Sequence, residues 1–165
     1  MLLTDCDGVL TDGGVYYGET GEVLKKFNIR DGMGVERLRN LAGVDTGIVT
    51  GERSPSVVKR AEKLKIEELH LGIKDKLTLL AEILERRQLL AEEVAFIGDD
   101  VNDVAVLQVV GLSCCPADAT IWNKNVAVYC CETKGGAGCF REVAELIIQA
   151  KTIKSHQSTE THQVA

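Results

Sequence analysis

Short apolar runs alternate with stretches of helical periodicity along this chain, a pattern typical of an α/β fold. The runs are short enough to be buried strands, and they lie at residues 2–4, 47–50, 69–71, 94–97, 112–114 and 126–130. Between them, apolar residues recur every three or four positions, as they do on one face of a helix. We therefore predict a three-layer, Rossmann-like domain in which helices cover both faces of a parallel sheet.

The helices and one hairpin can be placed from local signals. Helices are expected at residues 35–42, 54–64, 77–84, 101–110 and 140–147. Ser54 is predicted to cap the second of them, with Pro55 in its first turn. Residues 15–27 hold two apolar stretches around a glycine-bounded turn, which predicts a β-hairpin inserted into the α/β pattern. The domain is predicted to span 1–151, followed by a disordered polar tail over 152–165.

The composition fits one globular domain. The chain has 165 residues, of which 45% are hydrophobic and 27% charged, and no apolar run approaches the length of a membrane span. No secretory signal is visible, so we expect a cytoplasmic protein with no membrane partner. The six cysteines include two adjacent pairs. Adjacent positions suit neither zinc ligation nor a disulfide framework, so we expect these side chains to be small buried hydrophobes.

Acidic residues are concentrated in two clusters. Five acids account for most of the net charge of −6, and they are Asp5, Asp7, Asp99, Asp100 and Asp103. The rest of the chain is near neutral and has no basic run, so no nucleic-acid partner is expected.

Both clusters follow predicted strands, at the sheet edge where α/β proteins bind ligands. Thr50 follows a second strand and Lys76 a third, which adds a hydroxyl and an ammonium to that edge. Clustered carboxylates repel one another unless a cation lies between them, and all-oxygen ligation suits Mg²⁺. A metal, a cation and hydrogen-bond donors are what a phosphoryl group requires. One aspartate can attack phosphorus, and a second, two residues on, can act as acid and base.

The motifs that carry this chemistry occur together and in one order. They are Asp5–Gly13, Asn28–Gly32, Thr50–Gly51, Lys76, Gly98–Asp103 and Gly135–Gly138 with Arg141–Glu142. In order and spacing they resemble the haloacid-dehalogenase-like phosphohydrolases from the first residue to about Ala150. The resemblance is closest to the capless branch. That branch contains the 3-deoxy-D-manno-octulosonate 8-phosphate (KDO 8-phosphate) phosphatases, the 9-phosphate phosphatases of nine-carbon sugar acids, and the C-terminal domain of CMP-sialate synthetases.

The resemblance implies a Mg²⁺-dependent phosphatase of a phosphorylated 3-deoxy-ulosonic acid, either KDO 8-phosphate or a KDN or sialate 9-phosphate. Asp5 is then the nucleophile and a metal ligand, and Asp7 is the acid and base, with its backbone carbonyl on the metal. Asp99 supplies the second metal carboxylate, and Asp100 and Asp103 support the metal directly or through water. The implied substrate-binding residues are Asp7, Asn28, Ile29, Arg30, Asp31, Gly32, Thr50, Gly51, Glu52, Arg60 and Lys76.

Two other classes of protein share parts of this pattern. A receiver-type signalling module also uses an acidic cluster, a Thr and a Lys, but its adjacent acidic pair comes early in the chain. A non-catalytic or residually active oligomerisation domain of a bifunctional acylneuraminate cytidylyltransferase predicts losses among the catalytic residues, and none is lost here. Only four residues precede Asp5, which keeps this second alternative open and suggests a piece of a longer protein.

Some local features have two interpretations. Lys76 fits a phosphate-binding amine or a solvated lysine in a first helical turn. The glycines of 135–138 fit a phosphate cradle or a mobile loop. Glu52 stands where KDO 8-phosphate phosphatases have an arginine, and it fits a residue extended into solvent or an acceptor for a hydroxyl of a longer sugar acid.

The hairpin bears on assembly. It presents more apolar surface than an isolated two-stranded ribbon can carry, and no cap domain fits between the motifs. We therefore expect hairpins of different chains to associate in a homotetramer, with the segment 135–138 reaching towards a neighbouring subunit.

Overall fold

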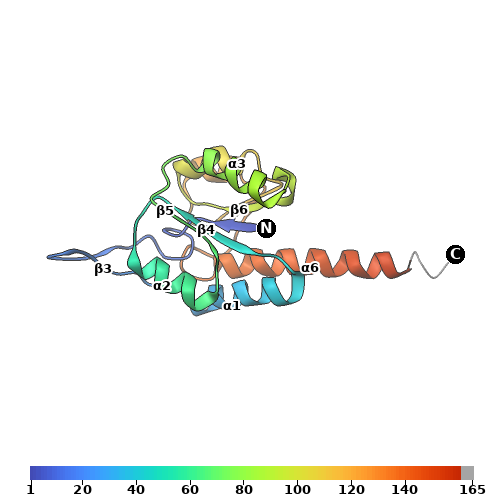
Figure 1. The fold of residues 1–165 in the computed structure, drawn as a ribbon, viewed down its shortest axis with the longest axis horizontal. Helices are drawn as coiled ribbons and strands as arrows, with labels where there is room; N and C mark the ends of the chain where they lie inside the picture. Colours follow the sequence, from blue (N-terminus) through green and yellow to red (C-terminus); the bar gives the residue numbers. More distant parts are fainter. Residues whose placement is uncertain (161–165) are drawn as a thin grey trace.

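The fold is built on one parallel sheet of six strands (Figure 1). The computed structural model describes residues 1–160, and the side chains of these through Ile153. In sheet order the strands are β5 (Glu68–Leu71), β4 (Thr46–Thr50), β1 (Leu2–Thr4), β6 (Ala95–Ile97), β7 (Leu112–Cys115) and β8 (Tyr129–Cys130). All neighbouring strands are parallel, so their carboxyl ends meet at one edge. This confirms the predicted architecture.

Helices cover both faces of the sheet (Figure 1). One layer holds α1 (Ile29–Arg37), its continuation η1 (Leu38–Ala42), α2 (Pro55–Leu64) and α6 (Cys139–Glu160). The other holds α3 (Lys76–Arg87), α4 (Val104–Leu107) and α5 (Ile121–Val126), with the short helices η2 (Ala91–Glu93) and η3 (Val101–Asp103). Two separate apolar clusters result, one on each side of the sheet. The two cores hold β1 and its neighbours rigidly, and so fix the loops at their carboxyl ends.

A hairpin of β2 (Tyr16–Gly18) and β3 (Gly21–Leu24) projects from the body as a separate two-stranded sheet (Figure 1). Between the first acidic motif and Thr50 the chain forms only this hairpin, α1 with η1, and β4. Between Lys76 and Asp99 it forms α3, η2 and β6. These segments contain no cap domain, as predicted, and no helix in the described part of the chain is long and apolar enough to cross a membrane.

The predicted strand at 126–130 is mostly wrong. Helix α5 occupies residues 121–126, and only Tyr129–Cys130 pair with β7. The buried Asn123 side chain donates a hydrogen bond to the carbonyl of Asp100 at 2.9 Å, which ties the helix to the acidic loop. Asn has a weak helix propensity, so a tertiary contact rather than a local pattern determines this helix.

Two predicted helix lengths also need correction. The helix expected at 101–110 is a 3₁₀ turn followed by α4, which ends at Leu107. Four residues after the end of α4, Gly111 lies so close to Glu92 that a Cβ would stand 2.1 Å from its carbonyl oxygen. In contrast, α6 continues to Glu160, beyond the predicted domain end, because residues 139–160 contain no glycine or proline. The helix thus includes residues 152–160 of the predicted tail, the last five residues of that tail lie outside the described part, and the domain boundary at 151 stays a prediction.

Candidate active site

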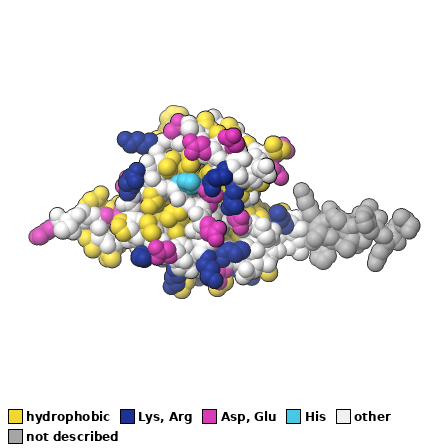
Figure 2. Space-filling view, in the orientation of Figure 1, with side chains coloured by type: hydrophobic (Ala, Val, Ile, Leu, Met, Phe, Trp, Pro, Cys, Tyr) yellow, Lys and Arg dark blue, Asp and Glu magenta, His cyan; other side chains and the backbone are white. Residues whose placement is uncertain are grey.

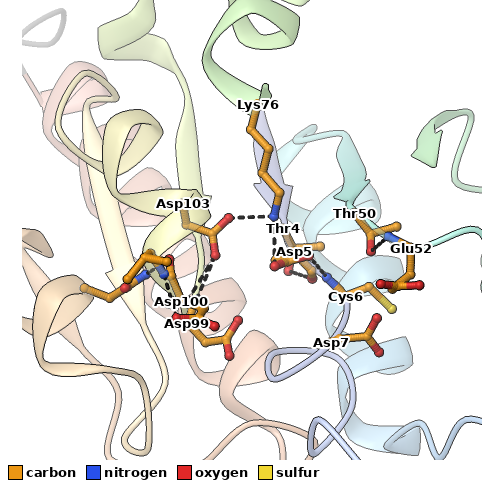
Figure 3. Close-up of polar contacts among 12 residues, drawn as sticks. Thr4, Asp5, Cys6, Asp7, Thr50, Glu52, Lys76, Asp99, Asp100 and Asp103 are labelled. Atoms are coloured by element: carbon orange, nitrogen blue, oxygen red, sulfur yellow. Dashed lines mark hydrogen bonds and ion pairs between the residues drawn. The ribbon is translucent and has the colours of Figure 1, made fainter. Parts of the chain in front are cut away.

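Three carboxylates from two neighbouring strand ends converge at the predicted edge of the sheet (Figure 3). Asp5 follows β1, and Asp99 and Asp103 follow β6. One oxygen of each lies within 4.8 Å of the other two. Asp5 and Asp103 are buried and Asp99 is half-buried. Convergent carboxylate oxygens of this kind can hold a divalent cation.

Lys76 lies against the same three-carboxylate group (Figure 3). It begins α3, and its Nζ is 2.8 Å from Oδ2 of Asp5 and 2.6 Å from Oδ1 of Asp103. Burial alone would lower the pKa of Lys76, but the charges of Asp5 and Asp103 outweigh burial and raise it. Lys76 is therefore a buried ammonium, and the alternative of a solvated lysine is wrong.

The carboxylates outnumber the positive charge beside them. Burial, with the charges of Asp5 and Asp103 added, raises the pKa of Asp99 to about 8, and burial also raises that of Asp5. Oδ1 of Asp99 is buried and has no hydrogen-bond partner among the described residues. An ionised carboxylate in such a place needs a counter-charge. A hard cation with oxygen ligands supplies it, so the residues fit Mg²⁺.

Asp7 lies in the loop after Asp5, outside the three-carboxylate group. Its Oδ1 accepts hydrogen bonds from Lys25 at 2.6 Å and from the Thr11 hydroxyl at 3.2 Å. Its Oδ2 is buried and without a partner among the described residues. Gly8, at φ +82°, allows the loop to pass Asp99, because a Cβ there would stand 2.0 Å from that carboxylate.

Asp100 is not a member of the converging group. It is exposed, and its Oδ1 accepts from the backbone N–H of Val101 at 2.7 Å at the start of η3. The neighbouring Asp103 instead turns inward, where its Oδ2 accepts from the N–H of Asp99 at 3.0 Å. Asp103 thus organises the acidic loop, and a ligand role of Asp100 stays a prediction.

The end of β4 and the loop after it bring a hydroxyl and two exposed residues to this edge. Thr50 is buried, and its Oγ1 accepts from the backbone N–H of Glu52 at 3.2 Å. Gly51 and Glu52 are exposed, and no ion pair of Glu52 occurs in the described part of the chain. Ser54 precedes α2 as predicted, but its hydroxyl donates to the carboxylate of Glu22 instead of capping the helix.

The predicted substrate-binding segment 28–32 is only partly accessible. Asn28 caps α1 by accepting from the N–H of Arg30 at 2.9 Å, and Ile29 and Arg30 are exposed. Asp31 is 2% exposed, and its Oδ1 accepts from the N–H of Arg141 at 2.9 Å. This bond holds Asp31 in the interior, whereas its Oδ2 has no hydrogen-bond partner among the described residues, and a contact with substrate stays a prediction.

Gly32 is buried against the guanidinium of Arg60, and its predicted role in substrate binding also stays a prediction. Arg60 donates to the carbonyl of Asn28 at 2.8 Å and lies 5.6 Å from the centre of the Phe27 ring. Together with Asp31 these residues line an internal cavity of about 10 Å³. Arg60 is therefore engaged in packing, and a role in substrate binding stays a prediction.

The glycines of 135–138 pack against the loop that follows β1 in their own chain. A Cβ on Gly135 would stand 1.9 Å from the carbonyl oxygen of Gly8, and one on Gly136 would stand 2.4 Å from the N of Asp12. The N–H of Gly136 donates to the carbonyl of Val9 at 2.9 Å. These contacts lie within one chain, and the expectation that the segment reaches towards a neighbouring subunit stays a prediction.

Comparison with known proteins identifies the family. Residues 66–141 match the family model described as haloacid dehalogenase-like hydrolase. The 3-deoxy-D-manno-octulosonate 8-phosphate phosphatase of Yersinia pestis is 43% identical over 92% of this chain and 80% of its own length. The corresponding phosphatase of Haemophilus influenzae is 37% identical over 92% and 83%. The chain belongs to the haloacid dehalogenase-like hydrolases.

The hydrolase also shares its structure with members of this family. The Y. pestis crystal structure matches with a TM-score of 0.88, covering 92% of this chain and 81% of that one. The phosphatase of Moraxella catarrhalis, solved in complex with a magnesium ion, a phosphate ion and KDO, matches with a TM-score of 0.88 at 32% identity, covering 96% and 91%. The hydrolase is thus a phosphoric monoester hydrolase by class, related to KDO 8-phosphate phosphatases, and the receiver-type alternative is excluded.

Proposed function

We propose that this hydrolase removes phosphate from a phosphorylated 3-deoxy-ulosonic acid through a covalent aspartyl-phosphate on Asp5, with Mg²⁺ as cofactor. One observation carries the proposal. Asp5 converges with Asp99, Asp103 and Lys76 at the carboxyl ends of the strands, and Asp7 lies two residues after Asp5 with an oxygen that has no partner in the described part of the chain. The relatives with the same fold are phosphatases of KDO 8-phosphate.

In the first step a carboxylate oxygen of Asp5 attacks phosphorus. The bond from phosphorus to the sugar oxygen breaks, its electron pair stays on that oxygen, and Asp7 protonates it. Hydrogen bonds from Lys76 at 2.8 Å and from the N–H of Cys6 at 2.6 Å hold the Asp5 carboxylate in place. The free oxygen of Asp7 is available for the proton.

In the second step Asp7, now ionised, accepts a proton from water. The water oxygen attacks phosphorus, and the bond from phosphorus to Asp5 breaks to release phosphate and the free carboxylate. The same residue thus acts as acid and then as base, and the site returns to its first state.

The metal belongs to the three-carboxylate group. Asp5, Asp99 and Asp103 would hold Mg²⁺ with one oxygen each, and the carbonyl of Asp7 is a further ligand that the family resemblance implies. When bound, the ion supplies positive charge that offsets the negative charge of the phosphoryl oxygens. Lys76 already contacts the same carboxylates, so it adds a second positive charge on that side of the site.

In this proposal the substrates include 9-phosphates of nine-carbon sugar acids. The kcat/KM for these substrates equals or exceeds that for KDO 8-phosphate. Glu52 supports this, because it is exposed two residues after Thr50 and is negatively charged. The arginine expected at this position in KDO 8-phosphate phosphatases is positively charged. A glutamate repels a substrate carboxylate but can accept a hydrogen bond from an additional sugar hydroxyl. Arg53 and Lys63 are exposed on the same segment and can offset part of that charge.

Self-association through the hairpin is also part of the proposal. Val15, Tyr16, Tyr17, Val23 and Leu24 are all exposed on the hairpin, and Figure 2 shows hydrophobic side chains over this part of the surface. A homotetramer would cover this apolar surface. A cytoplasmic location agrees with five buried cysteines that act as small core residues.

The test is a phosphate-release assay over phosphorylated sugar acids, with p-nitrophenyl phosphate as a general probe. The purified protein should release phosphate in the presence of Mg²⁺. EDTA should abolish this activity, and added Mg²⁺ should restore it. Asp7→Asn should lose most of the activity while keeping the fold, because an amide cannot move the proton. Absence of turnover with Mg²⁺ on every substrate would support the non-catalytic oligomerisation domain instead.

A further inference from the structure

Lys25 makes a partly buried contact with Asp7 that no sequence motif indicated. It follows β3 at the base of the hairpin, and only 1% of its side chain is exposed. Its Nζ lies 2.6 Å from Oδ1 of Asp7 and 3.1 Å from Oε2 of Glu22. A lysine seldom gives up its hydration so completely unless it is paired on both sides.

The contact makes the two oxygens of Asp7 unequal. Oδ1 accepts from both Lys25 and the hydroxyl of Thr11, whereas Oδ2 is buried and has no partner among the described residues. Two donors on one oxygen fix the rotation of the carboxyl group. The other oxygen is then the one left for an outside partner.

Lys25 is itself held in place from the body of the domain. Glu22, its second partner, accepts a hydrogen bond from the hydroxyl of Ser54 at the start of α2. The hydroxyl of Ser54 serves this contact instead of the helix cap. A chain of polar contacts therefore runs through the base of the hairpin and joins the loop after β4 to Asp7. Its members are Ser54, Glu22, Lys25 and Asp7.

We infer that Lys25 is a positioning residue for the reaction: it fixes Oδ1 of Asp7 so that Oδ2 exchanges the proton with the leaving oxygen and with water. The inference rests on the proposed role of Asp7. Lys25 touches Asp7 rather than the three-carboxylate group, so its effect is confined to proton transfer. Without the Lys25 side chain, Asp5 still attacks phosphorus, but hydrolysis is slower for substrates whose leaving oxygen must be protonated.

The experiment compares kcat/KM for two substrates whose leaving groups differ in their need for a proton. The alcohol of KDO 8-phosphate must be protonated as it leaves, whereas p-nitrophenolate leaves readily without help. Lys25→Met should lower kcat/KM about tenfold or more for KDO 8-phosphate, and less than about threefold for p-nitrophenyl phosphate. Lys25→Arg keeps the charge and a donor and should recover part of the loss. The matched control is Lys26→Met, because Lys26 is exposed and pairs with the exposed Asp12.

A second variant keeps the test decisive if Lys25→Met does not fold. Glu22→Gln removes the charge that holds Lys25, and it should produce a smaller loss with the same dependence on leaving group. Equal losses for both substrates, or no loss in either variant, would overturn the inference and leave Lys25 a structural residue. Failure of the wild-type protein to hydrolyse either substrate would instead contradict the proposed function, so the two failures are distinguishable.

Discussion

The ammonium of Lys76 lies 2.8 Å from Asp5 and 2.6 Å from Asp103, and the side chains of both Lys76 and Asp103 are fully buried. Removing this ammonium leaves buried carboxylates without their counter-charge. Lys76→Met should therefore lower the free energy of unfolding by about 3–5 kcal/mol in EDTA, and Mg²⁺ should restore a part of the loss. Urea unfolding measures both, with the exposed Lys74→Met as control. Equal stability of the two variants would show that Lys76 balances no buried charge.

Asp31 gives the stability a specific pH dependence. Burial raises its pKa to about 6 from 3.8, so between these values the folded protein holds a proton that the unfolded chain has lost. The stability contributed by neutral Asp31 is full below about pH 4 and is lost as pH rises through 6. Asp31→Asn cannot titrate and keeps an acceptor for the N–H of Arg141.

The Asp31→Asn variant should therefore gain stability relative to wild type, on the order of 2 kcal/mol, between pH 4 and pH 7.5. Urea unfolding at the two pH values measures the gain, and the exposed Glu67→Gln serves as control. A difference between variant and wild type that does not change with pH would show that Asp31 is not buried as described.

Glu52 should decide between sugar acids of different length. Glu52→Arg introduces a guanidinium that can bind a substrate carboxylate, so kcat/KM for KDO 8-phosphate should rise relative to that for a nine-carbon 9-phosphate. A tenfold change in this ratio corresponds to about 1.4 kcal/mol, one charge-assisted hydrogen bond. If the wild-type protein strongly prefers KDO 8-phosphate and Glu52→Arg leaves this preference unchanged, Glu52 does not determine substrate preference.

The hairpin should mediate the self-association of the chains. Leu24→Asp places a charge in its exposed apolar surface and should reduce the mass found by light scattering from that of a tetramer. Leu90→Asp is the matched control, because Leu90 is a leucine of similar exposure, 62% against 58%, outside the hairpin. A wild-type monomer that is fully active at nanomolar concentration would rule out this role of the hairpin.

The sheet and the acidic edge could be predicted from the sequence because both depend on local patterns. Each buried strand is a short apolar run, and a side chain directly after a strand lies at the sheet edge whatever the loop does. Asp5, Asp99 and Lys76 were therefore placed correctly. The hairpin was also found, since its glycine-bounded turn is a local signal.

Contacts between distant segments could not be predicted in the same way. The buried Asn123 side chain of α5 donates to the carbonyl of Asp100, 23 positions away, and the buried Asp31 accepts from the N–H of Arg141, 110 positions away. Lys25 was missed because a lysine after an exposed strand is ordinarily solvated. Only the fold brings it to Asp7. The one available hint was its position within the motif-bearing first third of the chain.

The central claim is that Asp5 becomes phosphorylated during turnover, and trapping that intermediate tests it most directly. The protein is mixed with Mg²⁺ and KDO 8-phosphate, quenched in acid during turnover and treated with borohydride, which reduces an acyl phosphate to an alcohol. Peptide mass spectrometry should then find reduction at position 5 in wild type, with Asp5→Asn inactive and unmodified. Turnover without modification at position 5, or full activity in Asp5→Asn, would contradict the account.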